Sequence, residues 1–136
     1  MNALEPGPAT GWRASLALEY RADAGRTWLA DRRHNGPLLV QKPLYPEGPA
    51  VCQTLIIHPP AGIAGGDALE VSVRVGPGAH AQVTTPGAAK WYRSAGPMAS
   101  LDQWLAVAPG GRLEWLPQET IFFDGALARS LPLIHI

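Results

Sequence analysis

Four histidines and one cysteine are the side chains best suited to bind a transition metal in this chain of 136 residues: His34, His58, His80, His135 and Cys52. They form no Cys-x-x-Cys or His-x-x-x-His pair, so the sequence predicts no structural zinc site. Cys52 and His58 would share one face of an unbroken strand with Thr54 and Ile56. Thiolate and imidazole suit a borderline metal ion, whereas a lone cysteine on a buried strand is more often a small core residue. Both interpretations of Cys52 stay open.

Side chains for nucleophilic or acid–base catalysis show no recognisable arrangement. The chain contains no Gly-x-Ser-x-Gly motif, and its serines stand in no triad context. Sequence spacing alone does not determine whether any two carboxylates face each other across a cleft. The sequence therefore predicts a protein that is not an enzyme. The carboxylates considered are Asp67, Glu70, Asp102, Glu114, Glu119 and Asp124.

The glycine-rich segment from Gly62 to Asp67 resembles a phosphate-binding loop only superficially. It has no Gly-Lys-Ser/Thr ending, and a strand rather than a helix is expected after it. Glycine permits positive φ, and the Asp67 side chain can accept hydrogen bonds from nearby backbone amides. We interpret the segment as a structural turn, with a binding loop as the alternative.

Charge and composition exclude several classes of partner. The formal net charge is zero and charged residues make up 16% of the chain, so no electrostatic attraction to nucleic acid or an anionic membrane is expected. The basic run Arg32-Arg33-His34 is interpreted as a solvated strand end. No apolar run is long enough to span a bilayer, and residues 1–10 do not resemble a signal peptide. With one cysteine and hence no internal disulfide, the sequence predicts a cytoplasmic protein.

Alternating apolar and polar residues predict an all-β fold. Trp12 to Tyr20 and Leu69 to Val75 alternate strictly, Val51 to Ile57 is strongly β-forming, and no helical period lasts three turns. Turns are expected at Ala24-Gly25 and at Gly76-Pro77-Gly78. The segment from Gly87 to Ser94 fits either a loop or a short strand.

A pattern that begins at Leu69 recurs 32 residues later, beginning at Leu101. Each copy is a strand, a Pro-Gly turn and a second strand, which we interpret as a repeated hairpin unit. Repeated units build a continuous core in a layered or helically wound β-stack. The alternative is that two unrelated hairpins use the same turn residues.

Four blocks in the segments that connect the strands resemble the urease accessory protein UreD family, also called UreH, in order and spacing. The resemblance runs from Trp12 to about Ala126 and matches the N-terminal half of the family. Ala61 departs from it, because the family usually has glycine there, and alanine requires a negative φ. The blocks are Gly36 to Gly48, His58 to Asp67, Thr85 to Ser94 and Leu113 to Phe123.

The resemblance implies a β-helix-like stack of short strands and a non-catalytic role in urease maturation. The implied partners are apo-urease and the accessory proteins UreF and UreG. The implied metal is nickel in transit, with no cofactor of the protein's own. A path for this cation needs oxygen donors that bind it weakly. We expect Asp67, Thr84, Thr85 and Glu114 to line it. Partner contacts or loop positioning are expected from His58, Lys90, Tyr92, Arg93 and Glu119.

The resemblance also divides the chain. Residues 1–10 are expected to be a flexible lead, residues 11–126 an incomplete UreD-like β domain, and residues 127–136 an atypical tail produced by truncation or a frameshift. The alternative to this whole interpretation is a stand-alone β-sandwich that binds carbohydrate or protein through its tryptophans. That alternative leaves the four ordered blocks unexplained.

Overall fold

The computed structural model describes residues 11–58 and 62–135, so Ala61 and the predicted lead at residues 1–10 lie outside the described residues. Within these ranges the chain forms twelve strands and no helix, which confirms the all-β prediction. No helix long and apolar enough to cross a membrane occurs in this part of the chain. The strands are β1 (Arg13–Asp23), β2 (Arg26–Asn35), β3 (Leu39–Val40), β4 (Val51–Ile57), β5 (Gly62–Ile63), β6 (Ala68–Val75), β7 (His80–Thr84), β8 (Ala89–Trp91), β9 (Ala99–Val107), β10 (Arg112–Leu116), β11 (Thr120–Phe122) and β12 (Ala128–His135).

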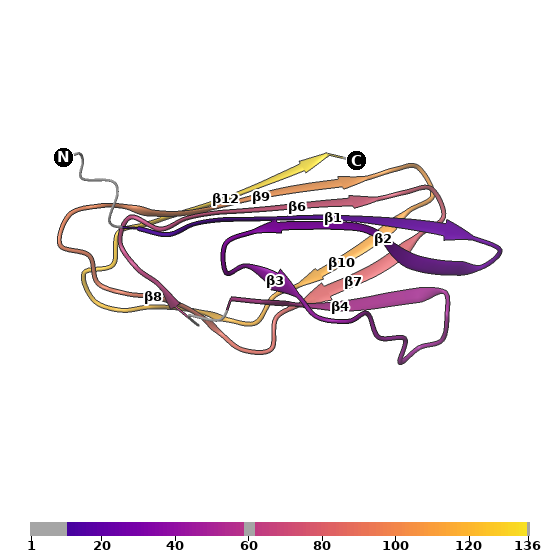
Figure 1. The fold of residues 1–136 in the computed structure, drawn as a ribbon, viewed down its shortest axis with the longest axis horizontal. Coiled ribbons are helices and arrows are strands. Elements are labelled where there is room, and N and C mark those ends of the chain that lie inside the picture. The colour runs from indigo at the N-terminus through magenta and orange to yellow at the C-terminus, as the bar shows by residue number, and fades with distance from the viewer. Residues whose placement is uncertain (1–10, 59–61, 136) are drawn as a thin grey trace.

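From β4 onward the chain winds as a parallel β-helix. Each turn visits three sheets in the same order, so that β6, β9 and β12 stack in one sheet, β4, β7 and β10 in a second, and β5, β8 and β11 in a third. Figure 1 shows the first two stacks as separate layers. All pairs within these stacks are parallel. The predicted β-helix-like stack is confirmed, and the stand-alone β-sandwich considered as an alternative is wrong.

The register confirms the 32-residue repeat. Leu69 pairs with Leu101, Val75 with Val107 and, in the next sheet, His80 with Arg112. The hairpin interpretation of each copy is wrong, because β6 and β7 belong to different sheets and do not pair. Turn residues allow the chain to reverse direction, but they do not determine which strand the following strand pairs with. The Pro-Gly segments form the corners of the helix, and β6 finds parallel partners in β1 and β9.

The first two strands form an antiparallel hairpin that extends the five-stranded sheet, whose order is β12-β9-β6-β1-β2. At its tip Ala24 and Gly25 both have positive φ (51° and 75°), the backbone of a tight two-residue hairpin turn. The predicted turn is confirmed. A bulge between Glu19 and Tyr20 shifts the register of the later part of β2. Between the turn and the bulge, Thr27 lies opposite Ala22 and is the buried residue of β2.

The core lies inside the helix, between the sheets. Inward-facing residues of β1 and β6 are almost fully buried, as strict alternation predicted. A buried hydrogen bond of 2.5 Å joins the Tyr20 hydroxyl to the Thr54 hydroxyl. Burial raises the pKa of Tyr20 well above its usual range, so the hydroxyl stays protonated. Cys52 is fully buried in the same core, and burial raises the pKa of its thiol. Its interpretation as a core residue is confirmed.

Candidate functional site

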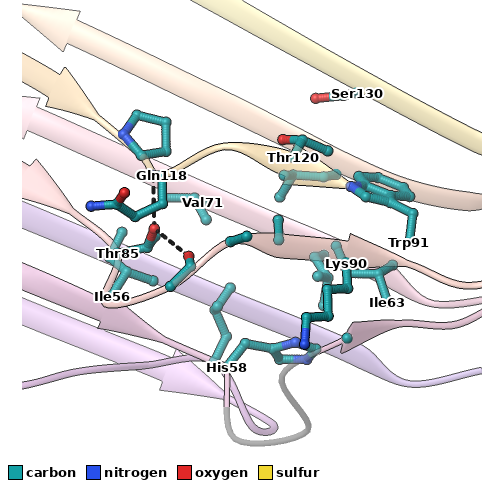
Figure 2. A pocket seen from close by; sticks show the side chains of 18 of the residues that line it. Ile56, His58, Ile63, Val71, Thr85, Lys90, Trp91, Gln118, Thr120 and Ser130 are labelled. Atoms are coloured by element: carbon teal, nitrogen blue, oxygen red, sulfur yellow. Dashed lines mark hydrogen bonds between the residues drawn. The ribbon is translucent and has the colours of Figure 1, made fainter. Parts of the chain in front are cut away.

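A cavity of about 590 Å³ occupies the interior of the helix between its three sheets. Figure 2 shows that its wall is largely apolar, with Ile56, Val71 and Trp91 among the lining residues. The polar side chains on the lining come from different turns of the helix, and they include Gln103, Gln118, Thr120 and Ser130. An apolar chamber with a few polar groups is the usual form of a small-ligand or transit site in proteins.

Thr85 connects the corner segments at one wall of the cavity. Its hydroxyl donates to the Gly87 carbonyl (3.0 Å) and accepts from the Gln118 backbone amide (3.0 Å), the two bonds drawn in Figure 2. Residues 85 and 118 belong to successive turns of the helix. The hydroxyl therefore fixes the spacing of two turns and is occupied by backbone partners.

His58 is also part of the lining and comes directly after β4. Its Nε2 atom is buried and has no hydrogen-bond partner among residues 11–58 and 62–135. Burial lowers the pKa of the imidazole, and the negative charge of Asp67 opposes that shift only in part. His58 is therefore a neutral imidazole on the cavity wall.

Asp67 holds the glycine-rich segment together. Its side chain is 3% exposed, and its two oxygens accept from the backbone amides of Trp12 (2.8 Å) and Ala64 (2.9 Å). Gly66 has a φ of 89°, a conformation that glycine adopts without strain. The interpretation of the segment as a structural turn is confirmed, and the Asp67 carboxylate is already fully engaged in it.

Glu114 faces away from the cavity. Its neighbours Leu113 and Trp115 pack on the core, so alternation places the Glu114 side chain on the outer surface of the four-stranded sheet. There its carboxylate contacts His80 Nε2 (2.5 Å) and accepts from the Gln82 amide (3.1 Å). The hydrogen bond with His80, followed by that with Gln82, lowers the pKa of the Glu114 carboxyl.

Thr84 also lies on the outer surface of the four-stranded sheet, where its hydroxyl donates to the Leu116 carbonyl (2.5 Å). The four predicted path residues therefore lie in three places: Thr85 on the cavity wall, Asp67 in its turn, and Thr84 and Glu114 outside. No group of three or more His, Cys, Asp or Glu side chains within residues 11–58 and 62–135 is arranged to hold a metal ion.

The five predicted contact residues are also spread out. Lys90 is exposed at the edge of the cavity, on the same lining as His58. The ring of Tyr92 stacks on Phe123 with centroids 5.4 Å apart. Arg93 bridges to Ala126 through its backbone, and the backbone carbonyl of Glu119 accepts from the Ala89 amide. Trp91, next to Lys90 in the same strand, is buried.

Sequence reasoning missed the polar cluster around Glu114. His80, Gln82 and Glu114 meet because parallel stacking places β7 beside β10, and Gln82 also donates to Glu47 (2.9 Å). The sequence did carry a signal for this cluster. If the 32-residue repeat is read as the register of stacked strands, the outward-facing polar residues of β7 and β10 fall side by side. The cavity residues Gln103 and Ser130 gave no signal, because their convergence depends on the winding of three turns.

Comparison with known proteins matches the chain to one family. The sequence model of the UreD urease accessory protein family matches residues 13–133. Urease accessory protein UreD of Dechloromonas aromatica (strain RCB) is 58% identical over 125 residues, which are 92% of this chain and 43% of that protein. The UreD of Azoarcus sp. (strain BH72) is 56% identical over 93% of this chain and 43% of its own length.

The UreD of Bordetella pertussis (strain Tohama I) is 60% identical over 122 residues, which are 88% of this chain and 43% of that protein. The chain thus spans less than half the length of these relatives. The family match includes most of β12 and so extends beyond about Ala126, where the resemblance seen in the sequence ends. A match over residues 13–133, together with these identities, means that the chain belongs to the UreD urease accessory protein family.

Proposed function

We propose that the protein acts in urease maturation as a non-catalytic scaffold that assists the delivery of nickel to apo-urease in the cytoplasm. The observation that carries this proposal is the 58% identity to a UreD over 92% of the chain. A β-helix also suits a scaffold, because stacked parallel strands present long, regular faces to large partners. UreF and UreG are the accessory partners that we propose for the complex.

The decisive experiment is a pull-down of apo-urease with the tagged chain, from cells that express the urease subunits with or without UreF and UreG. We expect urease to be retained, and retention to persist after washing in 0.15 M salt, at which exposed charges are largely screened. The purified chain alone is expected to hydrolyse no urea. Failure to retain urease in every combination of partners would contradict the proposal.

For the nickel path we propose Glu114 as the most suitable of the four predicted residues. Its carboxylate is partly exposed and adjoins an imidazole, and carboxylate and imidazole together suit a borderline cation. Thr84 shares that outer surface, and Thr85 borders the cavity. Both oxygens of Asp67 already accept hydrogen bonds from backbone amides in its turn. We therefore expect the weakest contribution to a path from Asp67.

The variant Glu114→Ala tests whether Glu114 acts in the nickel path or only in folding and assembly. We expect lower nickel content and activity of urease matured with the variant, and unchanged recovery of urease in the pull-down. The matched control is Glu70→Ala, an exposed carboxylate on β6 that has no imidazole partner among the described residues. Full activation by the Glu114 variant would remove Glu114 from the path while leaving the scaffold role intact.

A further inference from the structure

The second half of β2 is a free edge of the five-stranded sheet. β2 is the last strand in the order, and near its start Thr27 donates its backbone amide to Pro49 (2.9 Å). For residues 30–35, the described part of the chain provides backbone partners from β1 alone. A free strand edge carries unpaired N–H and C=O groups, and these can template the addition of another strand.

This edge carries an excess of positive charge. Arg32, Arg33 and His34 are all exposed. Arg33 lies 3.1 Å from Asp31, but both side chains are well exposed (81% and 43%), so water and salt weaken that pair. Arg32 forms no ion pair with any described residue. The local field therefore attracts carboxylates.

A hollow of about 280 Å³ adjoins the same edge, between β2 and β3. In the register of the hairpin, Arg32 lies opposite Leu18 and His34 opposite Leu16. Directly opposed residues share a face of the sheet, so Arg32 and His34 lie on the side of the buried leucines. The apolar part of the hollow is formed by Leu16, Leu39, Val40 and Ile57.

The other border of the hollow is also an edge, because β3 is the last strand of the four-stranded sheet. We propose that this slot receives an extended, acidic segment of a protein partner, which adds to β2 as a further strand. Aliphatic side chains on one face of that segment enter the hollow. Carboxylates on that same face reach Arg32 and His34, and a carboxylate on the opposite face reaches Arg33. A second copy of this chain is a poor occupant, since pairing β2 with β2 sets two basic runs against each other.

The test uses the whole 136-residue chain, fused to maltose-binding protein for solubility, and a fluorescein-labelled peptide in which pairs of glutamates alternate with pairs of valines, so that each face of the strand carries both. Fluorescence anisotropy measures the Kd. We expect binding that weakens as salt is raised and that the double variant Arg32→Glu/Arg33→Glu weakens by about tenfold or more. Arg74→Glu, an exposed arginine on β6 of the same sheet, is the matched control and should change the Kd by less than about twofold.

A second peptide, N-methylated at every other amide, keeps the charges but cannot form the strand ladder. It should bind at least about tenfold more weakly than the parent peptide. Equal binding of both peptides would mean simple charge attraction and would overturn strand addition. Three other results would overturn the proposal. The first is a Kd that stays the same in the double charge-reversal variant, and the second is no binding at millimolar peptide. The third is a dimer of the fusion protein that excludes the peptide.

Discussion

At the scale of single residues, the most consequential polar group is the Asp67 carboxylate. It is buried, and it satisfies two backbone amides that come from sequence positions far apart, Trp12 and Ala64. A buried donor that loses its acceptor costs about 1–3 kcal/mol. The side chain therefore ties the start of β1 to the glycine-rich turn before β6.

Asp67→Ala is expected to lower the free energy of unfolding by roughly 2–4 kcal/mol, because it leaves two amides without an acceptor. Urea denaturation followed by tryptophan fluorescence measures this change. This and the other unfolding experiments use the background Leu131→Lys/Ile134→Lys, because charge on the outermost strand opposes the aggregation expected of the parent chain. Asp31→Ala removes a carboxylate from an exposed ion pair and should change the stability by less than about 1 kcal/mol. Equal stability of the two variants would contradict the anchoring role of Asp67.

His58 predicts a pH dependence of stability. Burial lowers the pKa of the folded imidazole below its ordinary value of 6.5, so the unfolded chain binds the proton first as pH falls. The contribution of His58 is therefore fully present above pH 6.5 and is lost as the pH falls through the lowered pKa. His58→Phe should flatten the change in stability over this window, and it also removes the unpartnered Nε2.

The measurement is the unfolding free energy of the parent and the variant between pH 7.5 and 5, supplemented by an NMR titration of the His58 ring. An imidazole midpoint at or above the ordinary value of 6.5 would contradict the prediction. Groups distant from His58 titrate equally in both proteins, so the difference between the two curves isolates His58 together with its interaction with Asp67.

At the scale of elements, alternation in the sequence predicted the long strands but not β5 and β11. The segment from Gly87 to Ser94, which fitted either a loop or a short strand, contains β8. Val51–Ile57 was predicted with its observed bounds, whereas β5, β8 and β11 have only two or three residues and carry no measurable period. The hairpin interpretation failed at Gly76-Pro77-Gly78, because the choice between a hairpin and a corner depends on neighbouring turns. The same dependence on neighbouring turns hid the cavity. Of the four predicted path residues, only Thr85 lies on its wall.

The corners of successive turns stack closely, and glycine makes this possible at Gly111. A Cβ built there would lie 2.8 Å from the Gly76 carbonyl oxygen and 3.1 Å from that of Ala108. Gly111→Ala therefore has to push apart two backbone segments of adjacent turns. We expect a loss of roughly 1–3 kcal/mol in unfolding free energy, as for other overpacked sites.

Gly87→Ala is the matched control, because a Cβ at Gly87 meets nothing within 4 Å and its φ is not in the left-handed region. It should leave the unfolding midpoint within about 2 °C of the parent, or raise it slightly by restricting the unfolded chain. A thermal melt monitored by circular dichroism compares the two. Equal melting temperatures of the two variants would mean that the corners do not stack as described.

At the scale of the whole molecule, the helix presents an uncovered apolar cross-section at β10, β11 and β12, each the outermost strand of its sheet. Ile134 pairs with the core residue Leu105 in the register of β12 and β9, and therefore faces inward, yet it is 64% exposed. Phe122 lines the interior cavity and is 58% exposed. Apolar interior residues that no further turn covers, next to free strand edges, favour association.

We therefore expect the 136-residue chain, expressed alone, to aggregate or to require a partner. Leu131→Lys/Ile134→Lys places one charge on each face of the outermost strand, since Leu131 lies opposite Asp102 on the outer face and Ile134 opposite Leu105 on the inner one. Lysine on an edge strand opposes edge-to-edge pairing, so the variant should raise the soluble fraction and lower light scattering. Glu70→Lys, an exposed charge reversal in the middle of the same sheet, is the control and should have little effect.

Sedimentation velocity measures the association state of the parent chain. A parent chain that is monodisperse as a monomer and melts cooperatively would contradict the prediction. A variant that aggregates as much as the parent would place the associating surface elsewhere.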